Sequence, residues 1–268
     1  MTPLVTVCLP VFNNQDFLIE AISSVRCQTY PNIQIIAIDD CSMDDSYSIL
    51  KSYESDNFIV HKNPQNLGMK GNWNKCLELS DGKYIKMMGA DDILQPDCIS
   101  KQVAILEAFD INLVSSNRFI ISDQGKILLK LKYPFDGYVS GKKAIQKLVG
   151  AGRNIIGEPV AVLMRRDALI EIGGFSALNH YVIDIETWAK LFREKGFFAM
   201  DQYLSSFRVS QNSISSKEGL NQIQSVFEFI SSYSMDDVGF FTKVRGYLFA
   251  AAFGVIRNIV LGFSNRQK

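Results

Sequence analysis

Two adjacent carboxylates follow an apolar segment in the first third of the chain. Tyr84–Met88 has the composition of a strand, Gly89 and Ala90 follow it, and Asp91 and Asp92 come next. Paired carboxylates at a strand end are suited to a hard divalent cation, and such a cation is suited to a diphosphate. The alternative is an ordinary turn with a helix cap, because aspartate is common in turns.

Two earlier strands also end in polar loops. Ile33–Ile38 is an apolar strand followed by Asp39 and Asp40, and Leu4–Val11 is followed by Phe12 and Asn13. Loops at the carboxyl ends of parallel strands share one edge of the sheet, which is where open α/β sheets bind ligands. We therefore expect one polar cluster there, formed by Asn13, Asp39, Asp40, Asp91 and Asp92.

Strand-like and helix-like segments alternate through residue 116, which predicts a doubly wound, mostly parallel α/β sheet. The pattern then changes, because a turn at Asp123–Gly125 separates two strand-like segments and predicts a hairpin. Gly173 and Gly174 are expected to end the helix that begins at Arg166. Two short strands, Phe197–Met200 and Tyr203–Arg208, are expected before a helical C-terminus.

The composition excludes some classes of protein. Lys+Arg and Asp+Glu both total 28 in 268 residues, so the global charge does not indicate a nucleic-acid partner. The five cysteines are scattered and odd in number, which indicates reduced thiols, a cytoplasmic protein and no zinc site. The N-terminus has no signal-peptide pattern. The first strand is not followed by the glycine fingerprint of a dinucleotide-binding enzyme.

Short motifs spread over residues 3–216 resemble, in order and spacing, the inverting glycosyltransferase family two with the GT-A fold, of the bacterial surface-polysaccharide type. These motifs are Leu9–Asn13, Ile38–Ser42, Asn66–Gly68, Gly82–Ile85, Ala90–Asp92, Arg165–Phe175, Ile183–Trp188 and Phe207–Val209. The resemblance implies a Rossmann-like, mostly parallel sheet flanked by helices. It divides the chain into a GT-A domain at 1–216 and a C-terminal helical appendage at 217–268, with a nucleotide-binding half (1–116) and an acceptor-binding half (117–216).

The resemblance also implies a nucleoside-diphosphate sugar donor. Asp39 and Asp40 would contact the nucleoside, although helix capping and turn formation are the alternative for both. Lys70 would reach the diphosphate, and a solvated loop lysine is its alternative. The other residues expected to line the donor site are Pro10, Val11, Phe12, Asn13, Gly68, Asn74, Ala90 and Asp92.

The same family uses a metal motif of two aspartates separated by one residue. Gly89 stands where the first aspartate is expected, and Asp91 matches the second, which is the direct metal ligand. A histidine that helps to hold the metal in many members is replaced by Ser210. We therefore expect Mn²⁺ or Mg²⁺ to bind weakly, together with the diphosphate.

Asp184 matches the family's general base, which takes the proton of the acceptor hydroxyl. The alternative for Asp184 is the N-cap of the following helix. Glu186 is the next candidate for the base or for a substrate contact, and Glu158 is a further acid on the acceptor side.

The tail is apolar with basic flanks. Gly246–Phe263 is mostly apolar, and no acid follows Asp237. An apolar helix with basic residues can lie on an anionic membrane surface, and the alternative is a helix packed on the domain or on a second copy. A homo-oligomer is compatible with the sequence.

The function expected from these features is inverting sugar transfer to a hydroxyl of a glycan or lipid-linked acceptor, at the inner face of the membrane. The alternative is a nucleotide-sugar-binding module that is inactive in catalysis, because the first acid of the metal motif is missing.

Overall fold

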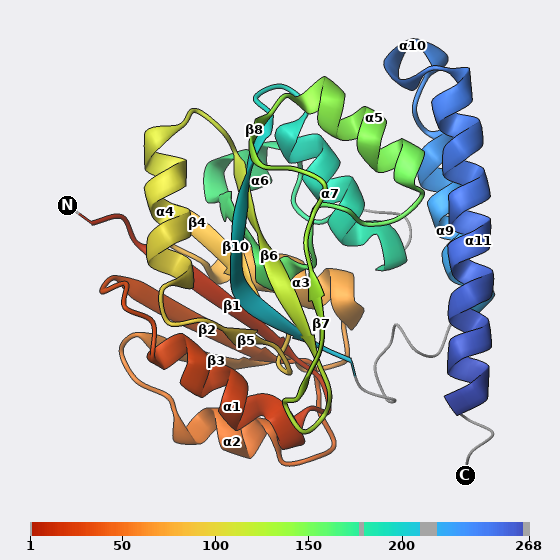
Figure 1. Cartoon of the computed structure of the whole chain (residues 1–268). Helices are drawn as coiled ribbons and strands as arrows, with labels where there is room; N and C mark the ends of the chain where they lie inside the picture. The colour runs from red at the N-terminus through yellow and green to blue at the C-terminus, as the bar shows by residue number, and fades with distance from the viewer. Residues whose placement is uncertain (1, 177–179, 210–218, 265–268) are drawn as a thin grey trace.

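The computed structural model describes residues 2–176, 180–209 and 219–264. Within these ranges, ten strands form one sheet in the order β3-β2-β1-β4-β9-β6-β10-β5, with β7 paired to β6 and β8 paired to β10 (Figure 1). The strands are β1 (Val5–Val11), β2 (Ile33–Asp39), β3 (Phe58–Lys62), β4 (Tyr84–Met87), β5 (Ile93–Leu94), β6 (Leu113–Ile121), β7 (Ile127–Leu131), β8 (Gly137–Val139), β9 (Val162–Arg165) and β10 (Phe197–Arg208).

Most of the long strands run in the same direction. β1 pairs in parallel with β2 and β4, and β2 pairs in parallel with β3. β9 lies antiparallel between β4 and β6, so β6 again runs in the direction of β4, and β10 is parallel to β6. The prediction of a mostly parallel α/β sheet is confirmed. The carboxyl ends of β1, β2, β4, β6 and β10 consequently share one edge.

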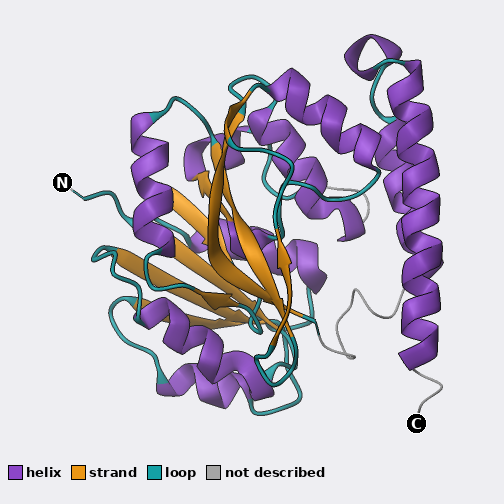
Figure 2. Ribbon diagram, viewed as in Figure 1, coloured by secondary structure: helices purple, strands orange, loops and turns teal. Residues whose placement is uncertain are grey.

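Helices cover both faces of this sheet (Figure 2). One buried apolar cluster contains residues of α1 (Gln15–Arg26), α2 (Ser46–Ser52) and α4 (Cys98–Ala108). The other contains residues of α3 (Gly68–Leu79), α5 (Gly141–Ala151), α6 (Arg166–Glu171) and α7 (Ile183–Phe192). The sheet therefore has an apolar core on each side, and polar side chains collect at its edge.

Several predicted segments differ from the observed ones. Phe197–Arg208 is one continuous strand, whereas the sequence predicts two. The register between β10 and β6 shifts around Tyr203, so one long strand changes its pattern of burial at that point. The short strands β5 and β8 were not predicted, because two or three residues carry no periodic signal.

The glycines after α6 end the helix as predicted. Gly173 and Gly174 both have positive φ angles, 83° and 72°. Gly173 N donates to Ile170 O at 2.9 Å and Gly174 N donates to Leu169 O at 2.9 Å. These bonds satisfy carbonyl groups at the helix end, and glycine adopts this conformation without strain. All five cysteines are free, which confirms the prediction of unpaired thiols.

The C-terminal segment is helical, as expected. It contains α9 (Gly219–Ser231), α10 (Met235–Val238) and α11 (Phe240–Ser264), and α11 lies along α5 and α9. Gly246 and Ala250 of α11 approach Gly152 so closely that a Cβ at Gly152 would lie 2.3 Å from Gly246 O. One face of α11 is therefore packed against the rest of the chain. No helix among the described residues is long and apolar enough to cross a membrane.

Candidate active site

The two acids at the carboxyl end of β2 are buried and make different contacts. Asp40 Oδ1 accepts hydrogen bonds from Asn63 Nδ2 at 2.7 Å and from Leu67 N at 2.8 Å, so this carboxylate organises the loop before α3. Asp39 Oδ2 accepts from Ser42 N at 3.1 Å, whereas Asp39 Oδ1 is buried without a hydrogen-bond partner in the described part of the chain. A nucleoside contact by either acid stays a prediction.

Asn13 ties the first polar loop to the second. Its φ angle is positive, its backbone N–H donates to Ser42 Oγ at 2.9 Å, and its Oδ1 accepts from Met43 N at 2.8 Å. Before it, Val11 is buried and Phe12 is about half exposed. Pro10 is partly buried beside them. The loop after β1 is thus held in place, and Phe12 is the side chain that it presents at the edge.

The acidic turn after β4 is packed around Gly89. A Cβ at this position would lie 2.8 Å from both Asp91 Oδ1 and Asp92 Oδ2, so the glycine leaves the space that these carboxylates use. Ala90 and Asp92 are buried, and Asp91 is partly exposed. Burial raises the pKa of Asp92, and the charge of Asp91 raises it further.

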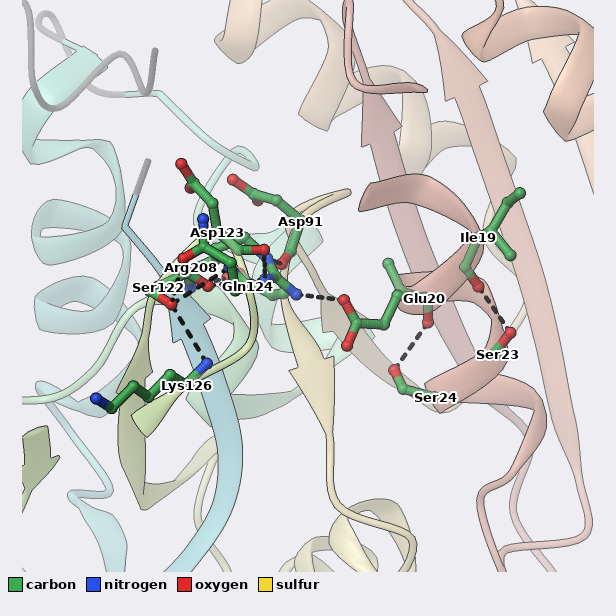
Figure 3. A network of polar contacts seen from close by, with 12 residues as sticks. Ile19, Glu20, Ser23, Ser24, Asp91, Ser122, Asp123, Gln124, Lys126 and Arg208 are labelled. Atoms are coloured by element: carbon green, nitrogen blue, oxygen red, sulfur yellow. Dashed lines mark hydrogen bonds and ion pairs between the residues drawn. The ribbon is translucent and has the colours of Figure 1, made fainter. Parts of the chain in front are cut away.

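Arg208, at the end of β10, holds this turn from below (Figure 3). Its Nε donates to Asp91 O at 2.9 Å, and its Nη1 donates at 2.9 Å to the carbonyl oxygens of Ser122 and Asp123. Its Nη2 forms an ion pair with Glu20 of α1. Asp92 Oδ1 accepts from the backbone N–H of Arg208 at 3.1 Å. One buried guanidinium therefore joins α1, the acidic turn and the β6–β7 turn.

The same contacts bring Asp123 close to Asp91. Figure 3 shows both side chains pointing to the same side of Arg208. Burial raises the pKa of Asp91, the Arg208 guanidinium lowers it, and the Asp123 carboxylate raises it. Ser210, which replaces the family's histidine, lies outside the described residues.

Three predicted residues lie on α3. Gly68 has a positive φ angle of 70° and begins the helix. Lys70 is exposed in the first turn, and its charge lowers the pKa of Glu186. Asn74 exchanges hydrogen bonds with the backbone of Phe175, at 2.8 and 2.9 Å. Asn74 therefore links α3 to the segment after α6, a role that the sequence did not predict.

Asp184 is a partly buried carboxyl in the first turn of α7. The N-cap of this helix is Val182, so the alternative that Asp184 is the cap is not what the structure shows. Asp184 Oδ2 accepts from Asn154 Nδ2 at 2.7 Å, and Oδ1 accepts from Ile185 N at 2.7 Å. Burial raises the pKa of Asp184 to about 7, and the charge of Glu158 adds to the shift. This value suits a general base near neutral pH.

The other candidate acids are less suited to take a proton. Glu158 forms an ion pair with the buried Arg118, whose guanidinium lies 4.9 Å from the ring centroid of Tyr133. Both carboxylate oxygens of Glu158 are engaged by Arg118, so they are not free to accept the proton of an acceptor hydroxyl. Burial raises the pKa of Glu186, while Lys190 and Lys70 lower it. The charge of Glu158 raises the pKa of both Asp92 and Asp184.

A divalent cation fits the acidic turn only with help from a ligand. No group of three or more metal-ligating side chains is found in the described ranges. Asp91 is the predicted ligand, and it is partly exposed at the edge. Mg²⁺ is commonly held by one or two carboxylates together with substrate phosphates and waters. The residues therefore fit a cation that binds with the diphosphate, and Asp123 adds a further carboxylate whose charge acts on Asp91.

Sequence reasoning missed Asn154, Arg118, Arg208 and Asp123 as parts of the site. The sequence predicts a hairpin turn at Asp123, which is where it lies, and Arg208 falls within one of the family motifs. Asn154 and Arg118 have no local signal, because their partners Asp184 and Glu158 are 30 and 40 residues away.

Residues 6–173 match the profile of the family described as glycosyl transferase family 2, and the chain belongs to this family. It is 27% identical over 220 residues to TuaG of Bacillus subtilis (strain 168), a protein named for teichuronic acid biosynthesis, covering 81% of this chain and 83% of TuaG. It is 32% identical over 120 residues to WfaP of Escherichia coli, covering 45% of this chain and 48% of WfaP. WfaP is named as a β-1,3-glucosyltransferase that uses UDP-Glc and an α-D-GlcNAc-diphosphoundecaprenol.

The chain is shorter than some of its relatives. It is 28% identical over 197 residues to MT1568 of Mycobacterium tuberculosis (strain CDC 1551 / Oshkosh), covering 70% of this chain and only 62% of MT1568.

Solved structures share the fold at low identity. Residues 1–349 of S. aureus TarS with UDP-GlcNAc have a TM-score of 0.69 and 14% identity, covering 96% of this chain and 73% of that one. The mannosyltransferase PcManGT of Pyrobaculum calidifontis, in complex with GDP-Man and Mn²⁺, has a TM-score of 0.67 and 14% identity, covering 97% and 76%. These similarities confirm the predicted GT-A fold.

Proposed function

We propose that this protein transfers a sugar from a nucleoside-diphosphate donor to a hydroxyl group of a glycan acceptor, with inversion at the anomeric carbon. The observation that carries the proposal is the Asp184 carboxyl, which accepts hydrogen bonds from Asn154 and Ile185 and whose pKa is raised to about 7 by burial and by the charge of Glu158. Asp184 takes the proton of the acceptor hydroxyl as its oxygen attacks the anomeric carbon from the face opposite the leaving diphosphate.

The donor binds along the carboxyl edge of the sheet. Asp39, Asp40 and the loop after β1 lie beside the nucleoside, and Lys70 reaches towards the diphosphate. A divalent cation at Asp91, when bound, neutralises the charge of the departing diphosphate. TarS and PcManGT were each solved with a nucleotide sugar, which supports this class of donor.

The test is a set of thermal shifts with UDP, dTDP, GDP and CMP, each with and without Mn²⁺, on the wild type and on Asp91→Ala. A ligand at 100 times its Kd stabilises the folded state by about 2.7 kcal/mol. We expect a metal-dependent shift with one nucleotide that is lost in Asp91→Ala. The absence of a shift with any nucleotide would contradict the proposal. Tight donor binding without transfer or hydrolysis would favour the inactive binding module.

We also propose a lipid-linked acceptor and contact with the cytoplasmic face of a membrane. One face of α11 packs on α5 and α9, and its other face is apolar and exposed. Phe241 is 85% exposed and Leu248 is 65% exposed. Phe240, Val244, Phe249 and Phe253 extend this face. The chain after Asp237 contains five basic residues and no acid. Lys243 and Arg245 donate to the carbonyl oxygens of Tyr233 and Gly150, so the attraction to an anionic lipid surface would come from the other three, Arg257, Arg266 and Lys268. The diphosphoundecaprenol in the name of WfaP supports the acceptor class.

Cosedimentation with vesicles tests the membrane contact. We expect binding to vesicles that contain phosphatidylglycerol and loss of binding in the double variant Phe241→Ser/Leu248→Ser. The matched control is Ile127→Ser/Leu128→Ser, which removes two exposed apolar side chains from β7. Equal binding of both variants would contradict the proposal, as would a concentration-dependent dimer that only Phe241→Ser/Leu248→Ser abolishes.

A further inference from the structure

One amide side chain closes the loop that connects α5 to the short helix before β9. Asn154 Oδ1 accepts from Ile156 N at 2.9 Å and from Gly157 N at 3.0 Å, and Nδ2 donates to Gly157 O at 3.0 Å. A fourth hydrogen bond connects the loop to α7, in which Asn154 Nδ2 donates to Asp184 Oδ2 at 2.7 Å. The loop and the proposed base are therefore joined through a single residue.

We propose that Asn154 is a positioning residue, which fixes the orientation of the Asp184 carboxylate for proton abstraction from the acceptor. The inference rests on the proposed function of Asp184. Ile185 N binds Oδ1 and Asn154 Nδ2 binds Oδ2, so the two bonds define the plane of the carboxylate. Each oxygen of a carboxylate has two lone-pair sites, so one site on each stays available to a hydroxyl proton.

The support of Asn154 is itself rigid. Trp188, which is fully buried in α7, donates from Nε1 to Gly157 O at 2.8 Å. The next residue, Glu158, is held by the ion pair with Arg118. Both ends of the turn are therefore fixed, one by the helix that carries Asp184 and one by the central strand β6. A site whose supporting residues are locked in this way keeps its geometry during a reaction.

Two neighbours of Asp184 shift its pKa in opposite directions. The hydrogen bond from Asn154 lowers the pKa of Asp184, whereas the charge of Glu158, from the same loop, raises it. Burial is the largest cause of the raised value. Removing the amide should therefore move the titration of Asp184 to higher pH, and neutralising Glu158 should move it to lower pH.

The variant Asn154→Ser isolates the bond to Asp184. A serine hydroxyl can accept from a backbone N–H two residues on, so the turn is retained in a weaker form, but the hydroxyl is too short to reach Asp184. Trp188→Phe is the matched control, because it removes the other side-chain hydrogen bond to Gly157 O without touching Asp184. Glu158→Gln provides the shift in the opposite direction.

The first measurement is a ¹³C NMR titration of protein labelled at the aspartate carboxyl carbons, with Asp184 assigned from Asp184→Asn. It requires no substrate. We expect the midpoint of Asp184 to rise by half a pH unit or more in Asn154→Ser, to fall in Glu158→Gln and to stay unchanged in Trp188→Phe, on the order of the pKa effects of single hydrogen bonds. An unchanged midpoint in Asn154→Ser would overturn the inference, as would an equal rise in Trp188→Phe.

The second measurement is the release of UDP from UDP-glucose and from UDP-N-acetylglucosamine as a function of pH. Asn154→Ser should lower kcat and shift the acidic limb of the pH–rate profile to higher pH, while the KM for the donor stays unchanged. An increase in KM alone would mean that the residue only maintains the loop, and this would overturn the inference. Full turnover by Asp184→Asn would instead overturn the proposed base, while the NMR result would still stand.

Discussion

Arg208 Nε donates a hydrogen bond of 2.9 Å to the carbonyl oxygen of Asp91, across 117 residues of sequence. The bond connects the end of β10 with the acidic turn after β4. The backbone N–H of Arg208 donates a second hydrogen bond to the same turn, at Asp92 Oδ1. The predicted metal ligand is thus placed by a strand of the other half of the chain. The position of Asp91 therefore depends on the buried guanidinium of Arg208 as well as on β4, the strand that precedes it.

Substitution of Arg208 should therefore be costly. Arg208→Gln leaves the carbonyl groups of Asp91, Ser122 and Asp123 without their donors, and we expect a loss of roughly 3 kcal/mol in the free energy of unfolding. The measurement is urea denaturation. The matched control is Arg193→Gln, which removes an exposed arginine paired with Asp237 at 3.6 Å, and it should cost less than about 1 kcal/mol. Equal losses would refute the role given to Arg208.

Asp184→Asn should remove transfer and retain donor binding. General-base assistance is worth roughly 10²–10⁴-fold, so the loss in kcat should fall in that range. Because the pKa of Asp184 is about 7, the wild-type rate should increase with pH through neutrality as the carboxyl ionises. The check is UDP release measured from pH 5 to 9, with the nucleotide thermal shift as the control for binding. A variant with normal turnover would exclude Asp184 as the base.

The same substitution should change stability in a pH-dependent way. The pKa of Asp184 is about 7 in the folded protein against a reference value of 3.8, so the folded state binds more protons between these values. The contribution of Asp184 to the free energy of unfolding of the wild type therefore decreases as the pH rises from about 4 to 7, and it is fully lost above pH 7. Asp184→Asn has no such loss, so its stability relative to wild type should be greater at pH 8 than at pH 5. Urea denaturation at both pH values measures this, and a constant difference would contradict the raised pKa.

Gly89→Ala should weaken the binding of Mn²⁺, so that nucleotide binding requires more of the metal. The new methyl group would lie within 2.8 Å of Asp91 Oδ1 and Asp92 Oδ2, so both carboxylates must move. We expect the Mn²⁺ concentration for the half-maximal thermal shift to increase on the order of tenfold, which corresponds to about 1.4 kcal/mol. The melting temperature without ligand serves as the control for folding. An unchanged Mn²⁺ requirement in a folded variant would mean that these carboxylates do not hold the metal.

Much of the fold is encoded locally. The apolar strands, the polar residues at their ends and the glycines that end α6 could all be identified, because their signals depend on short-range periodicity and backbone preference. The order of the motifs also indicated the family. Boundaries were less certain where a long strand changes its burial, as at Tyr203 in β10, because alternation is interrupted there.

The sequence by itself determined that acids lie at the ends of parallel strands and that Asp184 lies near the start of a helix. Only the tertiary structure decided which side chains meet. β9 runs antiparallel between β4 and β6, so the two halves of the chain form one sheet. This arrangement brings Arg208 to Glu20 across 188 residues and Asn154 to Asp184 across 30. Such pairs depend on strand order and on the burial of long side chains, which local patterns do not encode.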